Sequence, residues 1–304
     1  MAEENMIFNP ADANQATRRF LDNIMIEQRL IGADIADLTM QLFGETFSSP
    51  IMMPAFSHLN KVNEEGRTPM QEYAAAAKEL NIVNWVGMEP DEIYKTIAEE
   101  GAKTIRIIKP FADKEVIREQ MKFAEELGAL AVGVDIDHAF GPDGEYDVVD
   151  GITMHPLTEE DIKAFKAEAT VPFIIKGVLS ASDALACQRA GVDAIVVSHH
   201  HGRMPFAIPP LQVLPEIIEA LGENNTMKIF VDCSIDDGRD AYKALAMGAD
   251  AVSVGRGMMP GLMKDGRAGV VEKVTRMNQE LAELMEYTGV HTLADMDPSV
   301  LWER

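Results

Sequence analysis

The chain has 304 residues, of which 47% are hydrophobic and 25% are charged, a balance typical of a folded globular protein. Its 50 acidic residues outnumber 27 basic ones and give a formal net charge of −23, so binding to nucleic acids or anionic membranes is not expected. No apolar stretch reaches the roughly 18 residues of a membrane helix, and the acidic N-terminus lacks the pattern of a signal peptide. Two cysteines cannot form a disulfide framework, which favours a reducing cytoplasm.

The first 49 residues precede the regular part of the chain and are expected to form a cap. A short helix is predicted around 11–22, and a hairpin through the segment LTMQLFGETF at 38–47. We expect both elements to plug the N-terminal face of the fold that follows.

Eight short apolar runs recur along the rest of the chain. They are rich in β-branched residues, as in strands that are buried on both faces of a parallel sheet. The runs lie at 50–56, 81–87, 104–110, 129–136, 172–178, 194–200, 228–234 and 251–257.

The segments between these runs carry the signals of helices. Several have apolar residues at three- and four-residue spacing, which is typical of amphipathic helices. Thr158 and Asp161 match a capping box at the start of one segment. Clear helices are predicted at 68–80, 113–128, 159–169, 180–191 and 237–249.

This alternation predicts a (β/α)₈ TIM barrel, which takes about 250 residues. A doubly wound open sheet is the alternative, but it usually has about six strands and a glycine-rich turn after the first. The segment PIMMPAFSHLN has no such turn. We therefore expect one α/β domain over 1–304, with an N-terminal cap segment at 1–49 and the barrel and C-terminal helices at 50–304.

Lys176 ends the fifth predicted strand, at the mouth where a barrel places its active site. A buried lysine needs an anion or an electron-rich partner, because an unpaired buried charge costs several kcal/mol. The sequence leaves two interpretations open: Lys176 is an electrostatic partner of a bound cofactor or substrate, or it snorkels to solvent.

The sixth predicted strand ends in the segment SHHHGR, which contains three consecutive histidines and Arg203. On a continuing strand these rings alternate faces, so His199 is expected to point away from His200 and His201. Adjacent histidines cannot all converge on one ion, and no HxH, HExxH or CxxC pattern supports a metal site. One histidine acting as a general base, with Arg203 binding a carboxylate, is the better hypothesis.

Gly255 and Arg256 end the eighth predicted strand. In barrels the loops after strands seven and eight often bind phosphate. A glycine lets backbone N–H groups approach the phosphate, and an arginine supplies charge. A tight turn with a surface arginine is the alternative.

Five motifs in the C-terminal half of the chain resemble those of the FMN-dependent 2-hydroxy-acid dehydrogenase and oxidase family. They are IIKG, SHHHGR, LPEI, VD at 231–232, and DAYKALAMGADAVSVGRG at 240–257. The family's usual wording is L-K-G, S-N-H-G-G-R, D-G-G-V-R-R-G, F-K-A-L-A-L-G-A and G-R-P. Weaker similarity covers RRFLDNIMIEQRLI and PIMMPAF in the N-terminal part.

The resemblance implies a barrel that holds FMN at its mouth. Lys176 would lie against the pyrimidine end of the flavin and stabilise negative charge on the reduced ring. His200 would accept a proton from the substrate, and Arg203 would bind the substrate carboxylate. Cofactor contacts are further implied for Pro54, Ala55, Lys176, Ser198, Asp232, Gly255 and Arg256.

The sequence departs from the family pattern on both sides of this site. His199 and His201 replace an Asn and a Gly of S-N-H-G-G-R, and Asp236 stands where an arginine is expected near the phosphate. An acid there repels phosphate, and Arg239 is a candidate to replace the lost charge.

The largest changes fall on the expected substrate side. Arg106 and Ile108 are placed where the family's third strand has the Gln and Tyr of Q-x-Y, and His138 stands for a second carboxylate-binding Arg. Arg106, His138 and His201 are therefore the candidate substrate contacts.

We expect an FMN-dependent oxidoreductase that acts on a 2-hydroxy acid or a similar small anionic substrate. By resemblance it would be a homo-oligomer, a tetramer, in the cytoplasm. Two alternatives remain at this point: a barrel without redox chemistry that binds a phosphate ligand or works as an isomerase, and a histidine-ligated metal hydrolase.

Overall fold

The computed structural model describes residues 8–59 and 61–303 of the chain. The signal-peptide argument and the start of the expected cap segment therefore fall partly on residues 1–7, which lie outside the described residues. Among the described helices, none has the length and apolarity needed to span a bilayer.

An eight-stranded parallel sheet forms the centre of the molecule, in the order β4-β13-β12-β11-β10-β7-β6-β5. Its edges meet through a parallel bridge between Phe56 and Val86, and the Met53 N–H donates to the Val83 carbonyl at 2.9 Å. The sheet is thus closed, and the predicted barrel is confirmed. Its strands are β4 (Ile51–Met52), β5 (Asn84–Val86), β6 (Thr104–Ile108), β7 (Ala131–Asp135), β10 (Phe173–Val178), β11 (Ala194–Val197), β12 (Lys228–Val231) and β13 (Ala251–Ser253).

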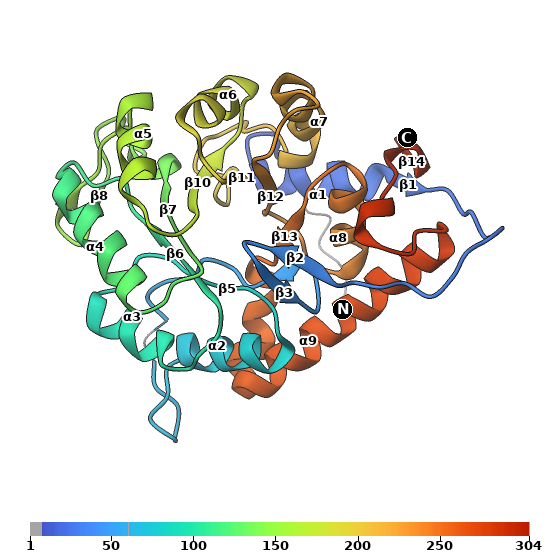
Figure 1. Cartoon of the computed structure of the whole chain (residues 1–304), viewed down its shortest axis with the longest axis horizontal. Helices are drawn as coiled ribbons and strands as arrows, with labels where there is room; N and C mark the ends of the chain where they lie inside the picture. The colour runs from blue at the N-terminus through green and yellow to red at the C-terminus, as the bar shows by residue number, and fades with distance from the viewer. Residues whose placement is uncertain (1–7, 60, 304) are drawn as a thin grey trace.

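A helix follows each of these strands and packs on the outside of the barrel (Figure 1). Thr68 and Thr158 each begin their helix with a capping box, and each such cap stabilises its helix by about 1 kcal/mol. The helices are α2 (Pro69–Leu80), α3 (Asp91–Ala98), α4 (Lys114–Glu126), α5 (Glu159–Glu168), α6 (Ala181–Ala190), α7 (Pro210–Leu221), α8 (Gly238–Ala246) and α9 (Met259–Tyr287).

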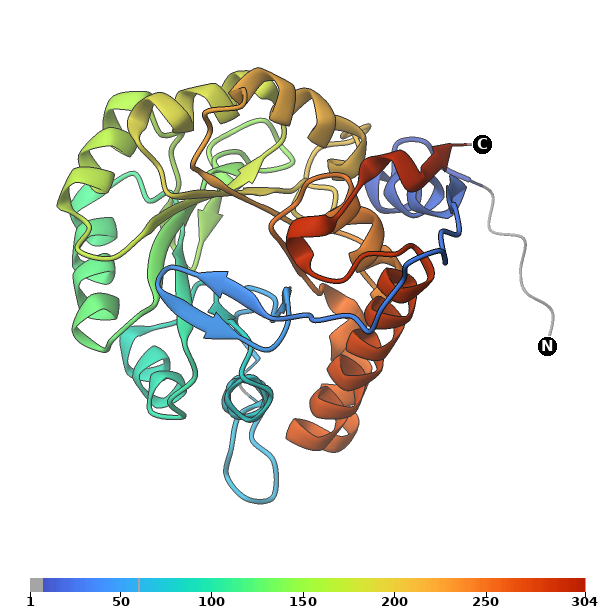
Figure 2. The same ribbon diagram turned by 45° about the vertical axis from the view of Figure 1, so that its right-hand side comes forward.

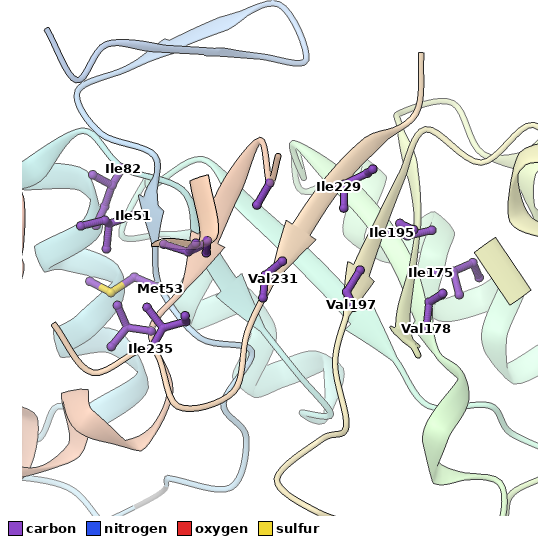
Figure 3. Packing of buried hydrophobic residues seen from close by; sticks show 14 of the residues in the cluster. Ile51, Met53, Ile82, Ile175, Val178, Ile195, Val197, Ile229, Val231 and Ile235 are labelled. Atoms are coloured by element: carbon purple, nitrogen blue, oxygen red, sulfur yellow. The ribbon is translucent and has the colours of Figure 1, made fainter. Parts of the chain in front are cut away.

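Alternation along the strands divides the buried side chains into two clusters. On β11, Ala194 and Val196 belong to the cluster inside the barrel, whereas Ile195 and Val197 pack outward beneath the helices (Figure 3). The same period of two governs every strand, so the residue that ends a strand is aimed either at the mouth or at a helix.

The N-terminal hairpin covers the N-terminal end of the barrel, as expected. It consists of β2 (Met40–Leu42) and β3 (Glu45–Phe47), and Met40, Leu42 and Phe47 join the cluster inside the barrel. Figure 2 shows this hairpin, in blue, lying across one end of the barrel.

The first helix, α1 (Ala13–Asn23), does not share that position, and the expectation that it plugs the same face is wrong. Thr17 Oγ1 lies 2.8 Å from His199 Nε2, and Asn14 Oδ1 lies 2.6 Å from His201 Nδ1. The polar face of α1 thus supplies partners for the loop after β11, at the opposite, C-terminal end of the barrel.

The remaining short elements complete the loops and the chain ends. The loop after β7 contains a 3₁₀ turn, η1 (Ile136–His138), and a small hairpin. Near the ends of the chain, β1 pairs antiparallel with β14. The elements not yet given are β1 (Ile24–Ile26), β8 (Val148–Val149), β9 (Ile152–Thr153), η2 (Arg256–Met258), η3 (Leu293–Asp295), η4 (Pro298–Val300) and β14 (Leu301–Glu303).

Candidate active site at the barrel mouth

Two adjoining cavities open at the C-terminal ends of the strands. The larger has a volume of about 570 Å³ and the smaller about 160 Å³, and both are lined by Ala55 and His200. Of the residues predicted to bind cofactor or substrate, the larger cavity is lined by Pro54, Ala55, Lys176, His200, His201, Asp232, Gly255 and Arg256. The smaller pocket is lined by Lys109, Asp135 and His138 as well.

Lys176 is buried at the floor of the larger cavity and does not snorkel to solvent. Its Nζ lies 3.4 Å from the Asp232 carboxylate and donates to Ser198 Oγ at 3.5 Å. Burial lowers the pKa of Lys176, but Asp232, Asp135 and Asp137 outweigh burial and raise the pKa above its ordinary value. The side chain is therefore a fixed positive charge, and Ser198 and Asp232 hold it in place.

The three histidines do not lie on a strand, so the alternation argument for them is wrong. Strand β11 ends at Val197, and the backbone at His200 and His201 is left-handed, with φ of 43° and 64°. His199 is nevertheless turned away from the cavities, because it is buried against Thr17 of α1.

His200 stands where the two cavities meet, and two carboxylates hold its ring. Nδ1 lies 2.6 Å from Asp137 Oδ1 and 3.1 Å from Asp135 Oδ2. Burial lowers the pKa of His200, but these carboxylates raise it above its ordinary value. With Nδ1 engaged, Nε2 is the ring nitrogen that remains to meet a substrate.

In the loop after β12, two residues with side chains adopt the left-handed backbone that glycine favours. Cys233 and Ser234 replace the two glycines of the family's D-G-G, and their φ angles are 72° and 56°. Left-handed backbone at a residue with a Cβ costs on the order of 1 kcal/mol. Both residues line the larger cavity.

At the end of the larger cavity where a phosphate is expected, Arg256 favours an anion and Asp236 opposes one. Arg256 lies against His201, and in the described part of the chain no carboxylate pairs with it. Asp236 lines the same cavity, and burial followed by the neighbouring Asp240 raises its pKa. Arg239 does not compensate, because it is 61% exposed and pairs with Asp237 at 2.7 Å.

Arg203 lines neither cavity; it lies behind His138, with Nη1 3.4 Å from His138 Nε2, and its guanidinium is already paired. It pairs with Asp147 at 2.6 Å and donates to the Phe140 carbonyl at 2.9 Å. His138 Nδ1 lies 3.3 Å from the same Asp147 carboxylate. Burial, with Lys109 next, lowers the pKa of His138 to about 3, so this ring is neutral and is no substitute for an arginine.

The structure corrects the assignment of Arg106 and Ile108 to the substrate side. Arg106 is 1% exposed and points at the helices, where it pairs with Asp91 at 2.7 Å and lies 4.4 Å from the centroid of the Tyr94 ring. Ile108 belongs to the outer cluster. The residue of this segment that reaches the mouth is Lys109.

Three residues of the site escaped prediction: Lys109, Asp135 and Asp137. Lys109 Nζ lies 2.8 Å from Asp135 Oδ2, and both carboxylates contact His200. Asp135 ends its strand, and Lys109 and Asp137 follow theirs within two residues. Their position at strand ends is the sequence signal for all three, and alternation along β6, in which Ile105 and Ile107 face the interior, adds a second signal for Lys109. His201, which the sequence predicts as a substrate contact, lies beside Arg256 and Asn14 at the larger cavity and does not line the smaller pocket.

Comparison with known proteins identifies the family. A family model described as FMN-dependent dehydrogenase matches residues 10–159 and 147–303. The chain belongs to the FMN-dependent dehydrogenase family. It is 37% identical over 160 residues to an L-lactate oxidase from a Roseobacter species, a match that covers 52% of this chain and 43% of that protein. It is 25% identical over 317 residues to a 2-hydroxyacid oxidase of Dictyostelium discoideum, covering 92% and 79%.

A solved structure of a mandelate oxidase variant carrying an FMN adduct superposes with a TM-score of 0.83 at 25% identity, covering 98% of this chain and 92% of that one. Family membership makes this chain an FMN-dependent oxidoreductase, and the alternatives without redox chemistry are not favoured.

The residues present fit FMN in charge and in space. Its ring system would lie against the buried Lys176 ammonium, and its phosphate would reach Arg256. A Cβ placed at Gly255 meets nothing within 4 Å, so the cavity wall is open there. Two carboxylates line this cavity; Asp232 is paired with Lys176, whereas Asp236 has no cation paired with it among the described residues and opposes a phosphate.

Proposed function

We propose that the protein oxidises a small hydroxylated substrate, a 2-hydroxy acid or a similar small anion, at the junction of the two cavities. The observation that carries this proposal is the position of His200, which faces both cavities while two carboxylates hold its Nδ1. When bound, FMN supplies the acceptor for a hydride equivalent.

The chain's own residues supply the proton chemistry and the charge. His200 Nε2 accepts the proton of the substrate hydroxyl, and a general base of this kind contributes about 10²–10⁴ in rate. Lys176 stabilises the negative charge of the reduced ring through a fixed cation in a buried site. Arg203 orients an anionic group, in competition with Asp147.

The substrate range follows from the smaller pocket. Its volume of about 160 Å³ limits the group that enters it to roughly the size of one small ring, and Ile107, Met88 and Val149 give it an apolar wall. Both cations on this side, Arg203 and Lys109, are already paired with carboxylates. A substrate carboxylate must therefore compete with a protein carboxylate for these cations, so a 2-hydroxy acid that is held by its carboxylate alone, such as L-lactate, is expected to bind weakly.

The decisive experiment has two steps. Titration of the purified protein with FMN, followed by quenching of flavin fluorescence, should saturate and give bands in the blue and near-ultraviolet. Anaerobic mixing with a panel of small hydroxy acids and amino acids should then bleach the flavin with the true substrate. Failure to bind FMN at high micromolar concentration would overturn the proposal.

Three further statements belong to this proposal. The single-domain organisation over 1–304 predicts one cooperative unfolding transition by calorimetry. A homo-oligomer, expected as a tetramer, is tested by light scattering. A cytoplasmic location agrees with Cys187 and Cys233, which are both free, and is tested by fractionation of the source cells.

A further inference from the structure

Asp137 is placed to act on His200, although no step of the proposed function requires it. It lies in the 3₁₀ turn η1, two residues after Asp135 ends β7. Its Oδ1 makes the shorter of the two contacts to His200 Nδ1, 2.6 Å against 3.1 Å for Asp135. A Cβ at Gly177 would collide with Asp137 Oδ2, so the glycine after Lys176 leaves the room that this carboxylate occupies.

The donors around the two carboxylates reach only one oxygen of each. His200 Nδ1 carries a single hydrogen, and Lys109 serves Asp135 Oδ2. Among the described residues, Asp135 Oδ1 and Asp137 Oδ2 are buried without any hydrogen-bond partner. Such an excess of buried carboxylate oxygen is stabilised by keeping nearby cations charged.

His200 and Asp137 are the two groups in this cluster whose charge can change near neutral pH. Burial, with Asp135 next, raises the pKa of Asp137 to about 6, so this carboxylate is largely ionised at pH 7. The other titratable groups that face the imidazole are Lys109 after β6, Asp135 of β7, His138 of η1, Lys176 of β10, the flanking His199 and His201, and Asp232 after β12.

We propose that Asp137 is a second positioning carboxylate for His200, which together with Asp135 holds the imidazole in its protonated form before substrate binds. This inference deepens the proposed function, in which His200 is the base. It adds that His200 is an imidazolium in the site without substrate. His200 therefore becomes a proton acceptor only at a pH above the range in which an ordinary histidine loses its proton.

A metal ion is the rival explanation for the same cluster. Asp135, Asp137, His138 and His200 offer ligand atoms that lie within 4.8 Å of one another. However, Lys109 lies 2.8 Å from Asp135, and Arg203 Nη1 lies 3.4 Å from His138 Nε2. A divalent cation would have to enter beside these two positive charges, whereas a proton on His200 adds only a single charge.

The test is an NMR titration of the histidine ring signals in the purified protein, without substrate. The chain has seven histidines, and loss of one set of signals in His200→Gln identifies His200. In the parent protein we expect its titration midpoint above 6.5. In Asp137→Asn the midpoint should fall by about one pH unit or more, because an opposite charge at this distance shifts a pKa by about 1–3 units.

Two variants serve as controls. Asp143→Asn removes an exposed carboxylate of the same loop that does not contact His200, and it should leave the midpoint in place. Asp137→Glu keeps a carboxylate and should restore a raised midpoint.

Either of two results overturns the inference: a parent midpoint at or below 6.5, or an unchanged midpoint in Asp137→Asn. The first needs no variant, so the inference stays testable if Asp137→Asn does not fold. A stoichiometric divalent cation retained after dialysis against EDTA would also overturn it, because a metal-bound Nδ1 takes no proton. None of these readouts depends on FMN, so failure of FMN binding counts against the proposed function alone.

Discussion

The two sides of the barrel mouth differ in how their charges are balanced. On the cofactor side, Lys176 is buried with raised basicity and Arg256 has no carboxylate partner in the described structure. On the substrate side, Arg203 and Lys109 are each paired with a carboxylate. His200 and Arg203 match the family motif, but the carboxylates paired with Arg203 and Lys109 compete with an anionic substrate for these cations. Specificity depends on these competing partners as much as on the retained residues.

The largest effect is expected at His200, which belongs to both sides. In His200→Ala the rate of flavin reduction by the true substrate should fall by about 10²–10⁴, because the general base is lost. FMN should stay bound, since the charges of Lys176 and Arg256 are untouched. Stopped-flow absorbance under anaerobic conditions measures both.

His155→Ala is the matched control for this experiment, because His155 is exposed and lines neither cavity. Reduction of His200→Ala at the parent rate would refute the base assignment, and His138 would become the next candidate.

The cofactor side is tested next through Arg256. In Arg256→Ala the dissociation constant for FMN should rise about ten- to a hundredfold, because a charged hydrogen bond contributes about 1.5–3 kcal/mol. Riboflavin lacks the phosphate, so its affinity should change little. Arg239→Ala removes an arginine that pairs with Asp237 outside the cavity and should change neither. Equal weakening of both ligands would show that Arg256 does not contact the phosphate.

The substrate side is tested with simple acids. L-Lactate and glycolate should reduce the flavin about a hundredfold more slowly than the true substrate, since a loosely oriented carboxylate misplaces the reacting carbon. Asp147→Asn releases Arg203 from its carboxylate partner. We therefore expect it to improve the apparent KM for L-lactate by roughly tenfold in the anaerobic bleaching assay. Fast bleaching of the parent protein by L-lactate would contradict this assignment of the substrate side.

This contrast also explains how far the sequence alone could lead. The barrel, its strand positions and its capping boxes follow from local periodicity, and the cofactor-side residues follow from strand ends such as those at Lys176 and Gly255. The ion pair between Arg203 and Asp147 joins residues 56 positions apart, through a loop whose path no local pattern specifies.

The errors of prediction have equally physical causes. The Q-x-Y comparison predicts Arg106 at the mouth, but Ile105 and Ile107 take the inner face of β6, so Arg106 faces the helices; a shift of one residue reverses the face of a strand. Strand alternation does not apply to His200 and His201, because β11 ends at Val197 and the backbone at both residues is left-handed. The amphipathic pattern of α1 does not indicate which end of the barrel its polar face meets, and the contact between Thr17 and His199 places it at the C-terminal end.

The smallest expected effect concerns Asp236, the acid that interrupts the otherwise favourable cofactor side. Burial and Asp240 raise the pKa of Asp236 above its ordinary value, so the carboxyl takes up a proton at a higher pH than an exposed aspartate does. The charged form repels the FMN phosphate, and the repulsion is therefore complete at high pH and is relieved as the pH falls through the raised pKa. In Asp236→Asn the FMN affinity at pH 8 should improve a few-fold, and the gain should shrink toward low pH.

Fluorescence titrations with FMN at several pH values measure this difference, and riboflavin, which has no phosphate, corrects for any other pH effect on the cavity. An FMN affinity at pH 8 that is the same in the parent and the variant would show that Asp236 lies outside the reach of the phosphate, and the two sides of the mouth would then differ more sharply than proposed.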